Sequence, residues 1–306
     1  MSFFSGNNIV GVKKDYFRKT FKHILEIFPL LFKGGIENWV EVQYKIYCLR
    51  VIYWQDIYQN LGVVLLWSML DVDPEKNIKS QAIEGINGKF IGSHWSNYSE
   101  QKIDNQKSYD IFFAWSDYFS KYNAIDGDLF ISGYPSDHYF KKIRSTVPRR
   151  YENNFVISFH DNIVSNDIMY SMQMQVDMHL MLISLLKEYH NVVILLKPKR
   201  MHTFEEVAKE VPDLKKWIES GRIEVFLGDS NFSKVSPAQV GMMSDLVVGL
   251  GISTAAAECC FSGITSFHVD LTGFYDNEFA NKCDGKFLYR SISDLRLAIE
   301  NQINGI

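Results

Sequence analysis

Apolar and polar residues along the second half of the chain form blocks typical of strands that alternate with helices. Short, continuous apolar runs predict buried strands at 155–159, 191–196, 223–227, 246–248 and 265–270. Patterns with one apolar face predict helices at 167–189, 203–219, 236–244, from 253 onward and at 292–302. Strands and helices that alternate at this interval indicate βαβ units, and therefore a doubly wound parallel sheet.

The first half has a less regular pattern. Residues 13–61 look helical and are rich in aromatic side chains, and Pro29 is expected to interrupt the helix. Further on, strands are predicted at 63–67, 89–93, 111–114 and 129–132, and a helix at 75–86. This half therefore predicts another α/β unit, abbreviated and helix-rich at its start. Because the basic stretch from Lys141 to Arg150 suits a linker, we expect domains at 1–145 and 151–306.

Composition narrows the class of protein. An apolar share of 46% and a charged share of 22% are those of a soluble globular protein, and a net charge of −4 gives no case for nucleic-acid binding. Four cysteines without metal-type spacing and no recognisable secretory signal favour a reducing, cytoplasmic setting. No apolar run approaches the roughly 20 residues that span a bilayer.

One segment departs from this picture. Residues 13–33 carry six basic residues against Asp15 and Glu26, with aromatic and aliphatic residues at helical spacing. A basic amphipathic helix of this kind can lie on an anionic membrane surface. The alternative is that it covers a domain core. Peripheral contact with the inner face of the plasma membrane is thus one of two open expectations.

The run 245–263, DLVVGLGISTAAAECCFSG, predicts a buried strand, a tight turn and a helix. Gly249 and Gly251 allow the turn and the close approach of another group. Ser253 or Thr254 is a candidate N-cap, and three alanines follow. Free N–H groups and a partial positive charge at such a helix start suit a phosphate. The alternative is an ordinary strand–helix crossover without a ligand.

Polar residues follow several of the predicted strands. Ligands of open α/β sheets bind at the carboxyl ends of the strands. That rule places on one edge His160, Asp161, Lys197, Lys199, Arg200, Gly228, Asp229 and residues 249–254. The basic side chains in this set could face a phosphate, and Glu258, one turn inside the last helix, could accept hydrogen bonds from ribose hydroxyls.

Four segments together resemble a known family. They are YDIFFAWSDYFSKYNAIDGDLFISGYPSDHYF (109–140), GKFIGSHWSNY (88–98), NVVILLKPKR (191–200) and the run 245–263. Their order resembles the GT-B class of nucleotide-sugar glycosyltransferases, in particular bacterial enzymes that build capsular and lipopolysaccharide surface glycans. Two features depart from the family: no proline follows Gly263, and no His-Pro pair follows the 191–196 strand.

The resemblance implies two Rossmann-like domains facing a cleft, an N-terminal acceptor side and a C-terminal donor side. It implies sugar transfer that is inverting and needs neither a metal nor a cofactor. The base that takes the acceptor proton is sought among His94, Asp137 and Asp161. The donor-binding candidates are Lys197, Lys199, Arg200, Gly249, Gly251, Ser253, Thr254 and Glu258. For His94 the alternative is a packing or capping role, and for Asp137 a helix cap.

The predicted function is therefore transfer of a sugar from a nucleotide-activated donor to a glycan or lipid-linked acceptor of the bacterial surface. A CMP-linked acidic sugar such as 3-deoxy-octulosonate (Kdo) is favoured slightly, because basic residues could meet its carboxylate. The alternatives are a polyol-phosphate transferase, a nucleotide-sugar epimerase of the same fold, and a non-catalytic subunit with a vestigial donor site. The sequence does not indicate the acceptor, the linkage or the oligomeric state.

Overall fold

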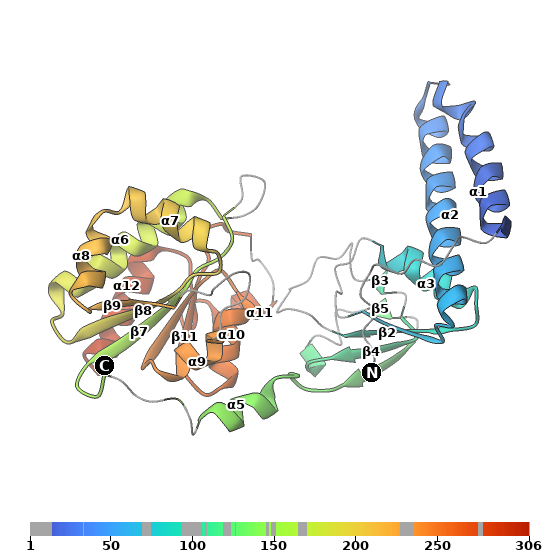
Figure 1. Ribbon diagram of the computed structural model, residues 1–306. Coiled ribbons are helices and arrows are strands. Elements are labelled where there is room, and N and C mark those ends of the chain that lie inside the picture. Colours follow the sequence, from blue (N-terminus) through green and yellow to red (C-terminus); the bar gives the residue numbers. More distant parts are fainter. Residues whose placement is uncertain are drawn as a thin grey trace. The chain divides into compact units, whose positions relative to one another are not determined.

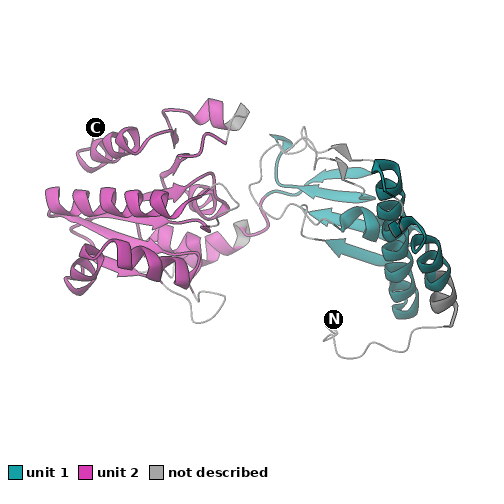
Figure 2. Cartoon of the chain, turned by 90° about the horizontal axis from the view of Figure 1, so that it is seen from above, with its two compact units in different colours: residues 1–95, 100–133 teal, residues 96–99, 134–306 magenta. Residues whose placement is uncertain are grey.

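Two sets of parallel strands organise the computed structural model of the chain, each in its own compact unit. One unit comprises residues 1–95 and 100–133, and the other comprises residues 96–99 and 134–306 (Figure 2). The structure describes residues 14–32, 34–68, 75–93, 106–107, 109–118, 124–125, 127–144, 147, 151–164, 170–226, 235–274 and 278–305.

The first unit begins with helices and continues with a four-stranded parallel sheet, in the order β1-β2-β4-β6 (Figure 1). Its larger elements are α1 (Lys14–Ile27), η1 (Leu30–Phe32), α2 (Ile36–Leu61), β1 (Leu65–Ser68), α3 (Lys76–Glu84), β2 (Lys89–Ser93), β4 (Ile111–Ala114) and β6 (Asp128–Ile131). A short pair, β3 (Gln106–Lys107) and β5 (Ala124–Ile125), adds a two-stranded ladder. Helices α1 and α2 are separate, as the proline at position 29 predicts.

The core of the first unit joins the carboxyl half of α2 to α3 and the sheet. Its buried residues are Tyr58, Ala82, Ile83, Phe90, Tyr109, Phe112 and Ala114. The αL conformation of Gly62 (φ 64°) ends α2, and its N–H bonds to the last-turn carbonyls of Tyr58 and Gln59. This turn directs the chain into β1.

The second unit is a six-stranded parallel sheet in the order β12-β11-β10-β7-β8-β9. Its elements are α5 (Asp137–Arg144), β7 (Phe155–His160), α6 (Met172–Glu188), β8 (Val192–Lys197), α7 (Met201–Glu210), α8 (Asp213–Glu219), β9 (Ile223–Val225), α9 (Pro237–Met242), β10 (Leu246–Leu250), α10 (Thr254–Phe261), β11 (Ser266–Val269), α11 (Glu278–Cys283), β12 (Leu288–Tyr289) and α12 (Ile292–Ile303). Numbered along this unit, the strand order is 3-2-1-4-5-6, the Rossmann order.

Successive residues of each central strand enter different cores, as a sheet covered on both faces requires. Ile157 and Phe159 pack with α6, α7 and α12, whereas Val156 packs with α9. Val247 packs with Ala256 of α10 on that second face. The continuous apolar runs in the sequence therefore correspond to strands with no exposed face.

Three features of the second unit differ from the sequence prediction. The helix expected at 203–219 is two helices, because Pro212 has no N–H to continue the α-helical ladder and the chain turns at Val211. The short elements α11 and β12 were not predicted. The first part of the basic stretch expected to be a linker belongs to α5, whose Phe140 and Ile143 are buried against Ala238 of α9.

Because α5 packs on α9, the boundary between the two units differs from the predicted one. The compact units meet in the sequence at Gly133 and Tyr134, ahead of the expected boundary between residues 145 and 151. Arg144, in the last turn of α5, donates a hydrogen bond to the carbonyl of Ser262 at 2.7 Å. Helix α5 therefore belongs to the second unit. In the part of the chain that the structure describes, no helix is both long and apolar enough to cross a membrane.

Candidate functional site

The carboxyl ends of four neighbouring strands bring chemically active residues into one row. His160 of β7 lies in register with Lys197 of β8 on one side and with Gly249 of β10 on the other. Gly249 in turn lies in register with His268 of β11. Because the chain winds in opposite directions from β7 and β10, their carboxyl ends form the topological switch point, where ligands of this fold class bind.

The loop after β7 ties this edge together. Asp161 accepts a hydrogen bond from the backbone N–H of Lys199 at 2.5 Å. The Asn162 amide donates to the carbonyl of Leu250 at 3.3 Å, and its Oδ1 accepts from Lys199 Nζ at 3.1 Å. The side chain of Gln175 on α6 donates to the Asn162 carbonyl at 2.9 Å. The ends of β7, β8 and β10 are thus bound to one another through two adjacent residues.

Asp161 is the ionisable group of this edge whose pKa is best suited to proton transfer. Burial raises the pKa of its carboxyl to about 7, although the Lys199 N–H and the charges of Lys199 and Lys197 act in the opposite direction. Desolvation lowers the pKa of both lysines, and the nearby Asp161 opposes that change. A carboxyl group that ionises near neutral pH can both accept and return a proton.

His160 cannot serve as a base in the same way. Burial, followed by the charges of Lys197 and His268, lowers the pKa of its imidazole to about 3. Its Nε2 lies 3.9 Å from Cys259 Sγ, and its Nδ1 finds no hydrogen-bond partner among the described residues. The ring is therefore neutral at physiological pH and packs beneath α10, which leaves Asp161 as the proton carrier of the pair.

The two glycines of the turn after β10 have distinct packing roles. A Cβ at Gly249 would lie 2.5 Å from the Cβ of Ala256, so this glycine lets α10 pack directly on β10. Gly251 has φ +72°, and a Cβ there would overlap the hydroxyl of Tyr170. The close approach expected at both positions is thus made by the protein's own side chains. Tyr170, 3% exposed, was not predicted as part of this turn.

Replacing Gly251 with Ala is expected to lower the free energy of unfolding by about 2–4 kcal/mol, through left-handed strain and the clash with Tyr170. Gly273 is the matched control, because it has φ +68° and nothing within 4 Å of an added Cβ. The Gly273→Ala variant should lose only about 1 kcal/mol. Urea denaturation of both variants measures the difference, and equal losses would show that Tyr170 does not constrain the turn.

Helix α10 starts as the sequence predicts, with Ser253 rather than Thr254 as its N-cap. Ser253 Oγ accepts the N–H of Ala256 at 3.4 Å. The turn is fixed from the next strand, because His268 Nδ1 donates to the Gly251 carbonyl at 3.1 Å. The N–H groups of the first turn and the positive end of the helix dipole therefore stand at the switch point, in an arrangement that suits a phosphate.

Glu258 is one turn further along α10 and is already held. The hydroxyl of Tyr134 donates to its Oε1, and the Tyr134 ring stacks on Phe140 with centroids 5.7 Å apart. Burial raises the pKa of the Glu258 carboxyl, and the bond from Tyr134 counteracts this. Any ribose hydroxyl that binds this carboxylate must share it with Tyr134.

We expect the Tyr134→Phe variant to lose about 1–3 kcal/mol of stability at pH 8, because a partly buried carboxylate loses its donor. Without that donor the pKa of Glu258 rises further, so the loss should shrink in acid, where the carboxyl is protonated. Thermal melts at pH 5 and pH 8 test this. The matched control is Tyr139→Phe on α5, the helix that follows Tyr134 in the chain, and a similar loss in both variants would contradict the role of the Tyr134–Glu258 bond.

Of the remaining candidates, only Arg200 has a side chain in the described part of the structure. Arg200 is exposed and precedes α7 without capping it. His94, Gly228 and Asp229 lie outside the described residues, as does the side chain of Asp137 at the start of α5. Among the described residues, no group of three or more His, Cys, Asp or Glu side chains is placed to hold a metal ion.

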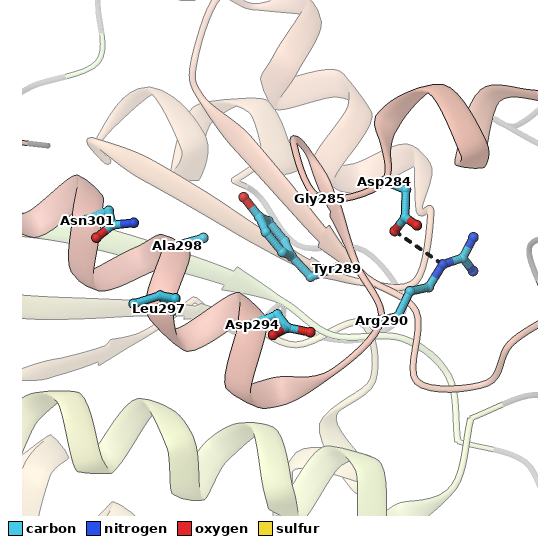
Figure 3. A pocket seen from close by; sticks show the side chains of 8 residues that line it. All are labelled: Asp284, Gly285, Tyr289, Arg290, Asp294, Leu297, Ala298 and Asn301. Carbon is cyan, nitrogen blue, oxygen red and sulfur yellow. Dashed lines mark ion pairs between the residues drawn. The ribbon is translucent and has the colours of Figure 1, made fainter.

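A cavity of about 550 Å³ lies beside β12 and α12 (Figure 3). Its lining consists of Asp284, Gly285, Tyr289, Arg290, Asp294, Leu297, Ala298 and Asn301. The Arg290 guanidinium on its rim is paired with Asp270 at 2.5 Å and with Asp284 at 3.6 Å. Because these residues differ from every donor-binding candidate, the cavity and the row of strand ends are separate features.

Comparison with solved structures identifies the same architecture in other proteins. The chain is similar to the MnaA–UDP co-structure from S. aureus, with a TM-score of 0.56 and 11% identity over 94% of this chain and 78% of that one. It is similar to UDP-GlcNAc 2-epimerase of Methanocaldococcus jannaschii, solved with UDP-GlcNAc and UDP (TM-score 0.55, 9% identity, 89% and 76% covered). A third match is α,α-trehalose 6-phosphate synthase of Burkholderia multivorans (TM-score 0.51, 10% identity, 95% and 76% covered).

No protein-family model and no curated protein sequence matches the chain. At these low identities, the solved structures establish the fold. The expected fold class is confirmed: the chain has an α/β fold with two Rossmann-like domains of the GT-B-like kind, and the similarity extends over most of its length.

Proposed function

We propose that the protein is a glycosyltransferase that uses a nucleotide-activated sugar. One observation carries the proposal: a carboxyl group with a pKa near 7, two lysines and the start of α10 converge on the switch point of a Rossmann-ordered sheet. Sugar transfer from a nucleotide needs a base for the acceptor hydroxyl and positive charge for the departing phosphate. This edge of the sheet supplies both kinds of group.

The roles follow from the contacts. The positive end of α10 binds the phosphate, and Lys197 and Lys199 stabilise the charge that develops on it as the sugar leaves. Asp161, in its ionised form, accepts the proton of the acceptor hydroxyl. Glu258 binds the ribose. His94 and Asp137 remain proposed alternatives for the base, and transfer with inversion and without a metal ion remains part of the proposal.

Two observations bear on the donor. UDP is bound in the MnaA co-structure and in the M. jannaschii epimerase complex, which favours a uridine nucleotide. The basic sequence from Lys197 to Arg200 suits the additional carboxylate of a CMP-linked acidic sugar such as Kdo. We propose a capsule or lipopolysaccharide glycan, free or lipid-linked, as acceptor, on the resemblance of the four sequence segments, and a cytoplasmic enzyme at the inner face of the plasma membrane.

Epimerisation is the second candidate, because one similar structure is a UDP-GlcNAc 2-epimerase. Incubation of the purified protein with UDP-GlcNAc or CMP-Kdo, with and without acceptor glycan, separates the two reactions. A transferase releases free nucleotide only when the acceptor is present, and chelation by EDTA should not slow it. An epimerase converts UDP-GlcNAc into its C2 epimer without any acceptor. A polyol-phosphate transferase requires a CDP-polyol as a third donor in this assay, from which it forms a phosphodiester product and releases CMP. No turnover of any of the three donors would favour a non-catalytic subunit.

A further inference from the structure

Helices α1 and α2 form a two-helix hairpin that carries an unusually apolar surface. The two helices lie side by side in Figure 1 and contact each other. Only the carboxyl half of α2 joins the core of the first unit, where Tyr58 is buried and Val51, Trp54 and Ile57 pack against it. In the other half, residues 36–50, Val42 is the only buried residue. The hairpin is therefore anchored at one end and exposed at the other.

The exposed end is the most apolar part of the hairpin. Phe28 is 62% exposed, Phe32 is 76% exposed and Ile36 is 74% exposed. They lie directly after α1, at the end of η1 and at the start of α2. Trp39 and Val40, in the first turns of α2, are 59% and 53% exposed. Side chains of this size, clustered at the turn between two helices, form an apolar tip rather than isolated surface residues.

The charge of this region differs in sign from the rest of the protein. Residues 13–61 contain eight Lys and Arg against five Asp and Glu, a net charge of +3. The remainder of the chain contains 24 Lys and Arg against 31 Asp and Glu, a net charge of −7. A second copy of the hairpin would bring like charge against like charge. An anionic lipid surface is complementary to it, and it also accepts aromatic side chains at its interface.

We infer that the α1–α2 hairpin docks on an anionic membrane surface, with the apolar tip formed by Phe28, Phe32, Ile36 and Trp39 immersed in the headgroup–acyl boundary. The excess positive charge of the hairpin lies in α1, because Lys45 and Arg50 of α2 are paired with Glu26 and Glu75. This charge attracts the hairpin to the lipid phosphates, and the acidic remainder of the protein is repelled from them. The docking is peripheral. It does not depend on the proposed sugar transfer, because it uses no residue of the second unit.

Sedimentation of the full chain with vesicles tests the inference. Wild-type protein should bind vesicles of phosphatidylcholine with 30% phosphatidylglycerol at least tenfold more tightly than pure phosphatidylcholine vesicles, and added salt should weaken that binding. The Phe32→Ser/Ile36→Ser variant should bind the anionic vesicles at least tenfold more weakly than wild type. Both replaced side chains are largely exposed, so circular dichroism and the melting temperature should be unchanged.

The matched control is Leu180→Ser/Phe287→Ser, which replaces two exposed apolar side chains of the second unit, 49% and 50% exposed. This control should bind the anionic vesicles as wild type does. No binding to anionic vesicles would overturn the inference, as would equal loss in both double variants. Sedimentation velocity without lipid adds a further test, because a dimer that the Phe32→Ser/Ile36→Ser variant dissociates would identify a second copy as the occupant of the tip.

Discussion

Replacing Asp161 with Asn should reduce the turnover of sugar transfer by about 100- to 10,000-fold, the usual contribution of a positioned base. The Asn side chain keeps an oxygen that can accept the Lys199 N–H, so the loop after β7 should retain its structure. It cannot accept a proton. The measurement is nucleotide release at saturating donor and acceptor. Asp213→Asn, an exposed carboxylate on α8, is the control and should retain full activity.

The pH dependence of activity and of stability gives a second test of the role of Asp161. Because the pKa of Asp161 is about 7 in the folded protein, against 3.8 for an ordinary aspartate side chain, activity should rise as pH increases through 7 and the base ionises. Stability should change in the opposite sense: the folded state binds the extra proton, so wild-type stability falls between pH 4 and 7, by at most about 4 kcal/mol. In the Asn variant the rise in activity through pH 7 should be absent, and the fall in stability between pH 4 and 7 should lose the contribution of Asp161. An unchanged pH–rate profile would assign the base to another residue, with His94 and Asp137 as the next candidates.

The second large effect is expected at Lys197. Its ammonium lies at the end of β8, in register with His160, and is partly desolvated. Lys197→Met removes a positive charge from the proposed departing phosphate and should lower kcat by about 100- to 1,000-fold, the range typical of such electrostatic groups. The same change removes a charge that lowers the pKa of Asp161, so the pH–rate profile should move to higher pH.

Lys209→Met provides the control for Lys197→Met, because Lys209 is exposed on α7, away from the strand ends. It should leave both kcat and the pH profile unchanged. If Lys197→Met raises KM for the donor while kcat stays constant, Lys197 binds the ground state only, and the proposed stabilisation of the leaving group is wrong. If the profile does not move, Lys197 and Asp161 are not coupled.

Local signals were sufficient for most of the second unit. Uninterrupted apolar runs predicted its central strands, since strands covered on both faces admit no polar alternation. The start of α10 at Ser253 or Thr254 and the turn at Gly251 were also predicted, because both depend on residues close in sequence. The structure selects Ser253 as the cap. The break at Pro212 was missed, since the apolar spacing of two short helices continued across it.

The candidate site was predictable only in its outline. The rule for parallel sheets placed Asp161 and Lys197 on one edge, but not the contacts that set their chemistry. Tyr134 and Glu258 are 124 positions apart, and no local pattern pairs them. Asn162 carried a weak signal, as an amide directly after a strand-end carboxylate. Tyr170 carried none, because its role exists only where it packs over Gly251. These contacts depend on long-range packing, which local patterns in a single sequence do not predict.

Nucleotide binding at the start of α10 is most directly measured by a thermal-shift panel with UDP, GDP, CDP and CMP. At about 100 times its Kd, a nucleotide that binds the folded state should add roughly 2.7 kcal/mol of stability, a shift of several degrees. Thr254→Glu places a negative charge at the first position of α10. There it interacts favourably with the helix dipole but repels a phosphate. The variant should therefore fold normally and lose the shift.

The matched control is Ser293→Glu, which places the same charge in the first turn of α12. The account predicts a clear shift with at least one nucleotide in wild type and in Ser293→Glu, and none in Thr254→Glu. No shift with any of the four nucleotides, or a shift that Thr254→Glu leaves intact, would contradict a donor site at the α10 start.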